Sequence, residues 1–185
     1  MRRMAGLLFL VVTGGFLLAP ASRESARGAG VAAEKPSTLD QDLAIVVNQS
    51  NSIVNLSKVE LRKIFLAQRT YWPNGRRITL VMREPGEPER KTVLSEICRM
   101  NEEEFKNHLL YGLFTGEILV TPKILATPAG VRKFVFNVPG AIGYLHGDDV
   151  DSTVKVISID ELLPGDKAYK LRVDPRTDKQ HEREK

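Results

Sequence analysis

The chain has 185 residues, with 27 basic and 23 acidic side chains and a formal net charge of +4 at pH 7. This near balance gives no basis for nucleic-acid binding, and the length suits one domain with its own hydrophobic core. A lone cysteine, Cys98, excludes an internal disulfide and with it a disulfide-stapled mini-protein.

Residues 1–21 have the three parts of a secretory signal peptide. Arg2 and Arg3 form a basic start, residues 7–18 an apolar core, and residues 19–21 an Ala-Pro-Ala cleavage site. The rival interpretation is an uncleaved membrane anchor, but the apolar core is shorter than the roughly 20 residues that span a bilayer. We therefore expect cleavage near Ala21, a periplasmic or otherwise exported product, and no membrane insertion after cleavage.

The mature chain then has three predicted parts. Residues 22–40 are rich in Ala, Gly, Ser, Arg and Glu without an apolar period, which predicts a flexible leader. Residues 41–173 form the predicted domain, and residues 174–185 a disordered charged tail. Without residues 1–21 the charges are 25 basic against 23 acidic, a net charge of +2.

The domain begins with a continuous apolar run at residues 43–47, typical of a strand buried on both faces, as in a parallel sheet. The polar loop after it contains Asn48, Ser50 and Asn51. Open α/β sheets bind ligands beyond the carboxyl ends of their strands, so these three are candidate ligand residues. The plainer interpretation is a turn.

A helix is predicted next, because Ser57 and Glu60 form a capping box and Leu56 can pack against Leu61. A Pro-Asn-Gly turn at residues 73–75 leads to a second buried strand at residues 78–82.

Tyr71 and Trp72 precede that turn and are open to two interpretations. They could form an exposed aromatic contact for a partner, or Trp72 could close the end of the core, which we prefer.

The segment from Arg83 to Leu94 joins this strand to an amphipathic helix through a Pro-Gly turn. Free N–H groups and the positive end of the dipole make a helix start suitable for anions, and Arg83, Arg90 and Lys91 add positive charge. Two acidic residues, Glu87 and Glu89, lie in the same turn, however, and contradict that chemistry.

Further helices are predicted from Asn101, whose first turn holds three glutamates, and from Thr127 before Pro128, through residue 136. Residues 141–145 form a third short strand, and the alternating residues 154–159 an edge or antiparallel strand. Strands and helices therefore alternate, which predicts an α/β domain.

No arrangement of residues typical of catalysis, and no Walker or dinucleotide loop, is visible, so we expect neither an enzyme nor a cofactor. The three histidines share no metal-ligand spacing, and residues 146–149 (His-Gly-Asp-Asp) are better explained by a turn than by a metal site. Cys98 lies on an apolar helix stripe, and a small buried side chain is favoured over a reactive thiol.

Four stretches in this order resemble the substrate-binding component of the phosphate ABC transporter: residues 43–48, residues 56–65 with Trp72 and Gly75 behind them, residues 83–94, and residues 139–144. The resemblance covers about residues 43–171. It implies an α/β single lobe of the type II periplasmic-binding-protein fold, with a mostly parallel central sheet flanked by helices. Two such lobes clamp phosphate in that family, and this chain has length for one.

The family's phosphate loop reads Arg-x-x-Gly-Ser-Gly-Thr. Arg83 and Gly86 keep its first two fixed positions, whereas Glu87, Pro88 and Glu89 replace Ser, Gly and Thr. A hydroxyl can donate to a phosphate oxygen, but a carboxylate only accepts and repels. Three hypotheses stay open: the glutamates stabilise the helix start and fill the pocket, they hold a cation, or the arginines still bind an anion.

The sequence therefore predicts an exported, non-catalytic, solute-binding-protein-like module with a remodelled anion site. One alternative is a genuine subunit that binds phosphate or another oxyanion for transport. The other is a structural or adaptor component of an envelope complex. A small anion such as phosphate, an envelope or transporter protein, or a second copy of the chain are the candidate partners.

Overall fold

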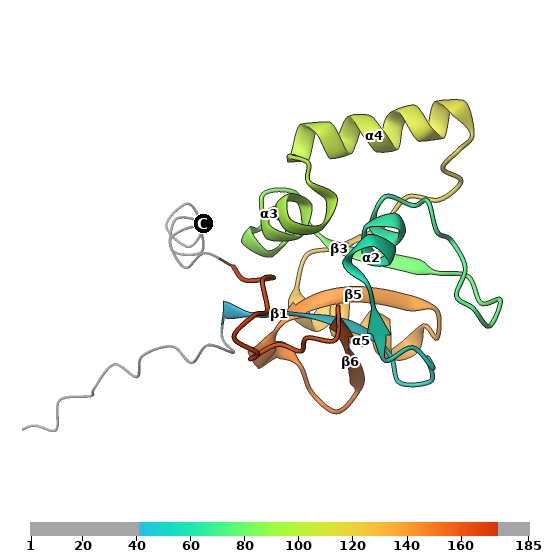
Figure 1. Ribbon diagram of the computed structural model, residues 1–185. Coiled ribbons are helices and arrows are strands. Elements are labelled where there is room, and N and C mark those ends of the chain that lie inside the picture. Colours follow the sequence, from blue (N-terminus) through green and yellow to red (C-terminus); the bar gives the residue numbers. More distant parts are fainter. Residues whose placement is uncertain (1–40, 174–185) are drawn as a thin grey trace, which may run out of the picture. The chain divides into compact units, whose positions relative to one another are not determined.

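The computed structural model describes residues 41–173 (Figure 1). The predicted signal peptide, leader and tail lie outside these residues and stay predictions. Within residues 41–173, no helix combines the length and the apolar character that a bilayer crossing demands.

The described domain contains six strands: β1 (Leu43–Asn48), β2 (Asn55–Leu56), β3 (Thr79–Arg83), β4 (Lys123–Leu125), β5 (Ala141–His146) and β6 (Val154–Ile159). Its α-helices are α2 (Lys58–Phe65), α3 (Pro88–Val93), α4 (Glu102–Thr115) and α5 (Pro128–Asn137). A π-helical turn, η1 (Leu94–Cys98), continues α3, and a 3-10 turn, η2 (Gly147–Asp149), follows β5.

The strands form one sheet in the order β2-β6-β1-β5-β3-β4. Three neighbouring pairs are parallel, namely β2–β6, β3–β5 and β3–β4. The predicted α/β class, with a central sheet flanked by helices, is confirmed. The sheet is nevertheless mixed, because β1 runs antiparallel to both of its neighbours, β5 and β6. A continuous apolar run predicts that both faces of a strand are covered. It does not predict whether the neighbouring strands run parallel or antiparallel to it.

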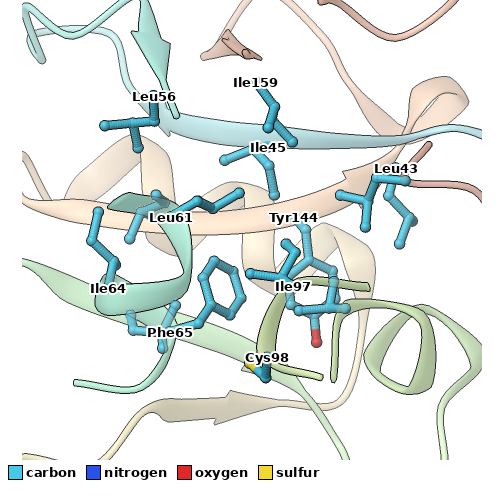
Figure 2. Close-up of a cluster of buried hydrophobic side chains, with 14 of the residues drawn as sticks. Leu43, Ile45, Leu56, Leu61, Ile64, Phe65, Ile97, Cys98, Tyr144 and Ile159 are labelled. Atoms are coloured by element: carbon cyan, nitrogen blue, oxygen red, sulfur yellow. The ribbon is translucent and has the colours of Figure 1, made fainter. Parts of the chain in front are cut away.

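Helices cover both faces of the sheet, which explains the apolar character of β1. Leu43, Ile45 and Val47 join the larger core with α2, α3, η1 and the start of α4. Ala44 and Val46 face the smaller core on the other side, beneath α5. Figure 2 shows the larger core, with Phe65 of α2 beside Tyr144 of β5 and their ring centroids 6.2 Å apart.

The predicted helix starts are confirmed. Ser57 Oγ accepts a hydrogen bond from the Glu60 N–H, and Glu60 Oε2 accepts one from the Ser57 N–H. Asn101 and Glu104 form the same reciprocal box at the start of α4, although only Asn101 was predicted as a cap. Thr127 caps α5 by accepting from the Gly130 N–H. Each cap satisfies backbone donors that a helix start leaves free.

Trp72 and Cys98 are both buried, as the preferred interpretations of the sequence predicted. Trp72 is 3% exposed, and its indole N–H donates to the Gly140 carbonyl at 3.0 Å, whereas Tyr71 is 57% exposed. Cys98 is fully buried in the larger core (Figure 2). Burial raises the pKa of its thiol to about 12, which keeps it protonated and unreactive near neutral pH.

Candidate functional site

The candidate site lies where β3 ends and α3 begins. Arg83 is the last residue of β3, and its backbone N–H donates to the Tyr144 hydroxyl at 3.0 Å. Gly86 has a φ of +94°, which lets the chain turn back toward the helix. Glu87 is the N-cap of α3, and Pro88 occupies the first turn. The segment therefore forms the strand–turn–helix unit that the sequence predicted.

The side chain of Arg83 is enclosed by two carboxylates and two carbonyls. Its Nη2 donates to Glu87 Oε2 at 2.9 Å, and its Nε lies 3.5 Å from Glu89 Oε1. On the other side Nη1 donates to the carbonyls of Leu125 and Ala126. The side chains of Arg83, Glu87 and Glu89 are only 7%, 9% and 9% exposed. The Arg83 cation is thus paired with carboxylates of the protein itself.

The two glutamates fill the site in a way that the sequence did not predict. Glu87 makes no side-chain hydrogen bond to the N–H groups of α3. Instead, the carboxylates of Glu87 and Glu89 point to Arg83. The two carboxylates therefore pair with a strand residue, and Glu87 does not cap the helix through its side chain.

His146, at the end of β5, joins this cluster. Its Nε2 lies 3.6 Å from Glu89 Oε1, and its side chain is 18% exposed. For residues 146–149 the sequence favoured a turn over a metal site, and the structure has the turn at Gly147–Asp149, but the sequence did not predict this contact of His146. One feature of the sequence could have indicated it: His146 follows Tyr144 by two residues and therefore lies on the same face of its predicted strand. Arg83 contributes one formal positive charge to this cluster, and Glu87 and Glu89 contribute two negative ones, which disfavours anions.

Arg90 connects α3 to the end of β3 and to the start of α4. Its Nη1 donates to the Arg83 carbonyl at 2.9 Å, and its Nε and Nη2 donate to the Glu102 carboxylate at the start of α4, at 2.9 and 2.6 Å. Its guanidinium also lies over the Phe105 ring, 5.7 Å from the centroid. Arg90 therefore ties α3 to α4, and its charge is neutralised by Glu102.

The loop residues Asn48, Ser50 and Asn51 lie at the opposite end of the sheet from Arg83. Because β1 is antiparallel to β5 and β5 is parallel to β3, the end of β1 lies beside the start of β3. Asn48 Nδ2 donates to the Val135 and Phe136 carbonyls at the end of α5. This separates the sequence-predicted residues into two groups that cannot share one ligand.

Besides the bonds to α5, the Asn48 loop makes hydrogen bonds within its own turn. The Ser50 N–H and hydroxyl both donate to Asn48 Oδ1, at 2.9 and 2.8 Å, and the Ile53 N–H donates to Asn51 Oδ1 at 3.0 Å. Asn51 Nδ2 is buried without a hydrogen-bond partner among the described residues. These contacts are those of a turn, the plainer of the two interpretations.

A metal site was one of the open hypotheses for Glu87 and Glu89. Among residues 41–173, no group of three or more His, Cys, Asp or Glu side chains could hold a metal ion. A cation at the glutamates would also have to displace Arg83, which already occupies that position at 2.9 Å from Glu87.

Comparison with known proteins places this geometry in a structural context. No protein-family model matches the chain, and no curated protein matches it. The solved structures that resemble it include an ABC-type phosphate transport receptor from Vibrio cholerae, a putative phosphate ABC transporter substrate-binding protein with bound phosphate from Clostridium perfringens, and PstS from Borrelia burgdorferi. Their sequence identities to this chain are 22%, 22% and 13%, and the TM-scores are 0.58, 0.60 and 0.58.

The match extends over 77%, 72% and 72% of this chain but over only 62%, 53% and 55% of those proteins. The chain therefore has the fold of a lobe of these phosphate receptors and spans little more than half their length. The fold implied by the sequence resemblance is confirmed.

Proposed function

We propose that this chain is an exported, non-catalytic binding module built on one receptor-like lobe, whose anion site has been remodelled into an internal ion-pair cluster. The observation that carries the proposal is the pairing of buried Arg83 with Glu87 and Glu89. Export rests on the sequence of residues 1–21, and mass spectrometry of the secreted form should find Ser22 at its N-terminus.

Electrostatics explain why this cluster excludes phosphate. Two unit charges about 4 Å apart interact by around 4 kcal/mol at an effective dielectric of 20. This repulsion from either glutamate exceeds the roughly 1.5–3 kcal/mol that one hydrogen bond to a charged group contributes. Pro88 also removes a backbone donor from the helix start. The unaltered protein should bind phosphate more weakly than about 1 mM.

Calorimetry with phosphate, sulfate and divalent cations tests this proposal. The combined change Glu87→Ser, Pro88→Gly and Glu89→Thr restores hydroxyl and backbone donors beside Arg83, so phosphate affinity should appear. Glu84→Ser is the matched control, because Glu84 is an exposed glutamate of the same turn. Tight phosphate binding by the unaltered chain would instead support a genuine phosphate-binding subunit for transport, as the names of the similar structures suggest.

A second candidate function is an adaptor or structural component of an envelope complex. One observation favours it, namely the concentration of exposed apolar side chains on α4, where Phe114 is 90% exposed. Exposed apolar surface of this kind is typical of sites that contact another protein. Recovery of a specific envelope protein with the mature chain, but not with Phe114→Asp, would support the adaptor function.

A further inference from the structure

Helix α4 has apolar residues on two opposite faces, and the domain covers only one of them. The inward face holds Phe105, which is fully buried, Leu109 and Gly112. Ile118 packs against Gly112 so closely that a Cβ atom there would lie 2.5 Å from Ile118 Cδ1. A helix that is apolar on two faces needs two partners, and the described domain supplies one.

The other face and the segment that follows it form an exposed surface, the α4 patch. Its residues and their exposed fractions are Leu110 (44%), Tyr111 (66%), Leu113 (42%), Phe114 (90%) and Leu119 (78%). In Figure 1, α4 lies at the margin of the described domain, with α2 and α3 on one side of it and no described element on the other. The patch is therefore open to a partner.

The size of the α4 patch is that of an interface. If a fully exposed aromatic side chain counts about 200 Å², these five side chains expose on the order of 600 Å². This matches the largest apolar patches of ordinary monomers, roughly 300–600 Å², which are often functional. Two such patches, one from each copy, would together bury on the order of 1,200 Å², the low end of specific interfaces.

We infer that the occupant is a second copy of this chain, whose α4 packs antiparallel on this one. The four helical residues of the patch centre on position 112. A two-fold axis there places the apolar side chains of both copies opposite one another and opposes the two helix dipoles.

Charge complementarity supports this antiparallel orientation. In this arrangement the half of α4 that holds Lys106 lies beside the C-terminal end of the second copy's α4, and Glu117 follows that end by two residues. Lys106 and Glu117 are both exposed, and neither forms an ion pair within residues 41–173. The dimer would contain this Lys106–Glu117 pair twice. The inference goes beyond the proposed function, since it holds whether or not Arg83 can bind an anion.

Sedimentation velocity of the mature protein, from about 1 to about 200 µM, provides the first test. A monomer–dimer equilibrium is expected, and Phe114→Asp should raise its dissociation constant at least about 10-fold. Phe136→Asp is the matched control, because Phe136 is 52% exposed on α5, on the opposite face of the sheet. Circular dichroism confirms that each variant is folded.

A charge exchange provides the second test, specific to antiparallel pairing. Lys106→Glu and Glu117→Lys should each weaken the dimer, and the variant with both changes should restore it. A monomer at every concentration would overturn the inference, even if an envelope protein binds the patch. A dimer that is insensitive to Phe114→Asp, or that the combined charge exchange fails to restore, would overturn it as well.

Discussion

Replacing Glu87 by Gln should destabilise the domain strongly, because it leaves the buried Arg83 charge without its best partner. The two side chains are 7% and 9% exposed and hydrogen-bonded at 2.9 Å. Removing one partner of a buried ion pair costs about 3–5 kcal/mol. Arg83 keeps the Ala126 carbonyl and the Glu89 carboxylate, so we expect the lower end, about 3 kcal/mol. Gln preserves the size of the side chain, so the change isolates the charge.

Glu89→Gln should cost less, about 1 kcal/mol. Its carboxylate lies 3.5 Å from Arg83 Nε, too far for a good hydrogen bond, and its Oε2 is buried without a partner among the described residues. Removing this charge also removes the penalty of burying it. A larger loss of stability for Glu87→Gln than for Glu89→Gln would therefore reflect the closer contact of Glu87 with Arg83.

Urea denaturation of the mature protein measures both free energies of unfolding, provided that the slope with denaturant stays constant. Glu84→Gln is the control, since this exposed side chain of the same turn should change stability by less than about 0.5 kcal/mol. A loss below about 1 kcal/mol for Glu87→Gln, or a larger loss for Glu89→Gln, would show that Arg83 does not depend on Glu87.

Two further predictions concern titration and thiol chemistry. Hydrogen bonds from Ser57, chiefly from its backbone N–H, hold the pKa of Glu60 below its ordinary value of 4.5. Its stabilising effect is thus complete above pH 4.5 and is lost as the pH falls through the lowered folded-state pKa, so urea midpoints of Glu60→Gln should fall less steeply with acid. Since burial raises the pKa of Cys98 to about 12, a thiol reagent at pH 8 should label it only after unfolding; rapid labelling of the folded protein would contradict its burial.

The sequence predicted those features that neighbouring residues determine. Ser57 and Glu60 cap a helix because both partners lie within one turn of chain, and the apolar run at residues 43–47 predicts a buried strand wherever it is placed. The direction of the strands beside β1 was not accessible in this way. It depends on residues about 100 positions away, and antiparallel pairing to two strands buries the same side chains as parallel pairing would.

In the candidate site, too, the features set by neighbouring residues were predictable and those set by distant residues were not. The turn that brings Arg83, Glu87 and Glu89 together is local, and the sequence predicted it. Whether the glutamates cap the helix or reach back to Arg83 depends on side-chain directions that the order of residues does not determine. His146 and Ala126 enter the cluster only because β4 and β5 flank β3 in the sheet.

The order of the strands also has a consequence for how this protein is made. The central strand β1 is synthesised first among the strands, but its two partners, β5 and β6, are the last. In a nascent chain on the ribosome, the five core residues of β1 therefore stay unpaired until about 100 more residues have emerged, and contacts so distant in sequence form slowly. Such an exposed apolar segment can be bound by a chaperone. If residues 1–21 direct the chain to a translocation channel, slow pairing of β1 would keep the chain unfolded long enough to pass through it.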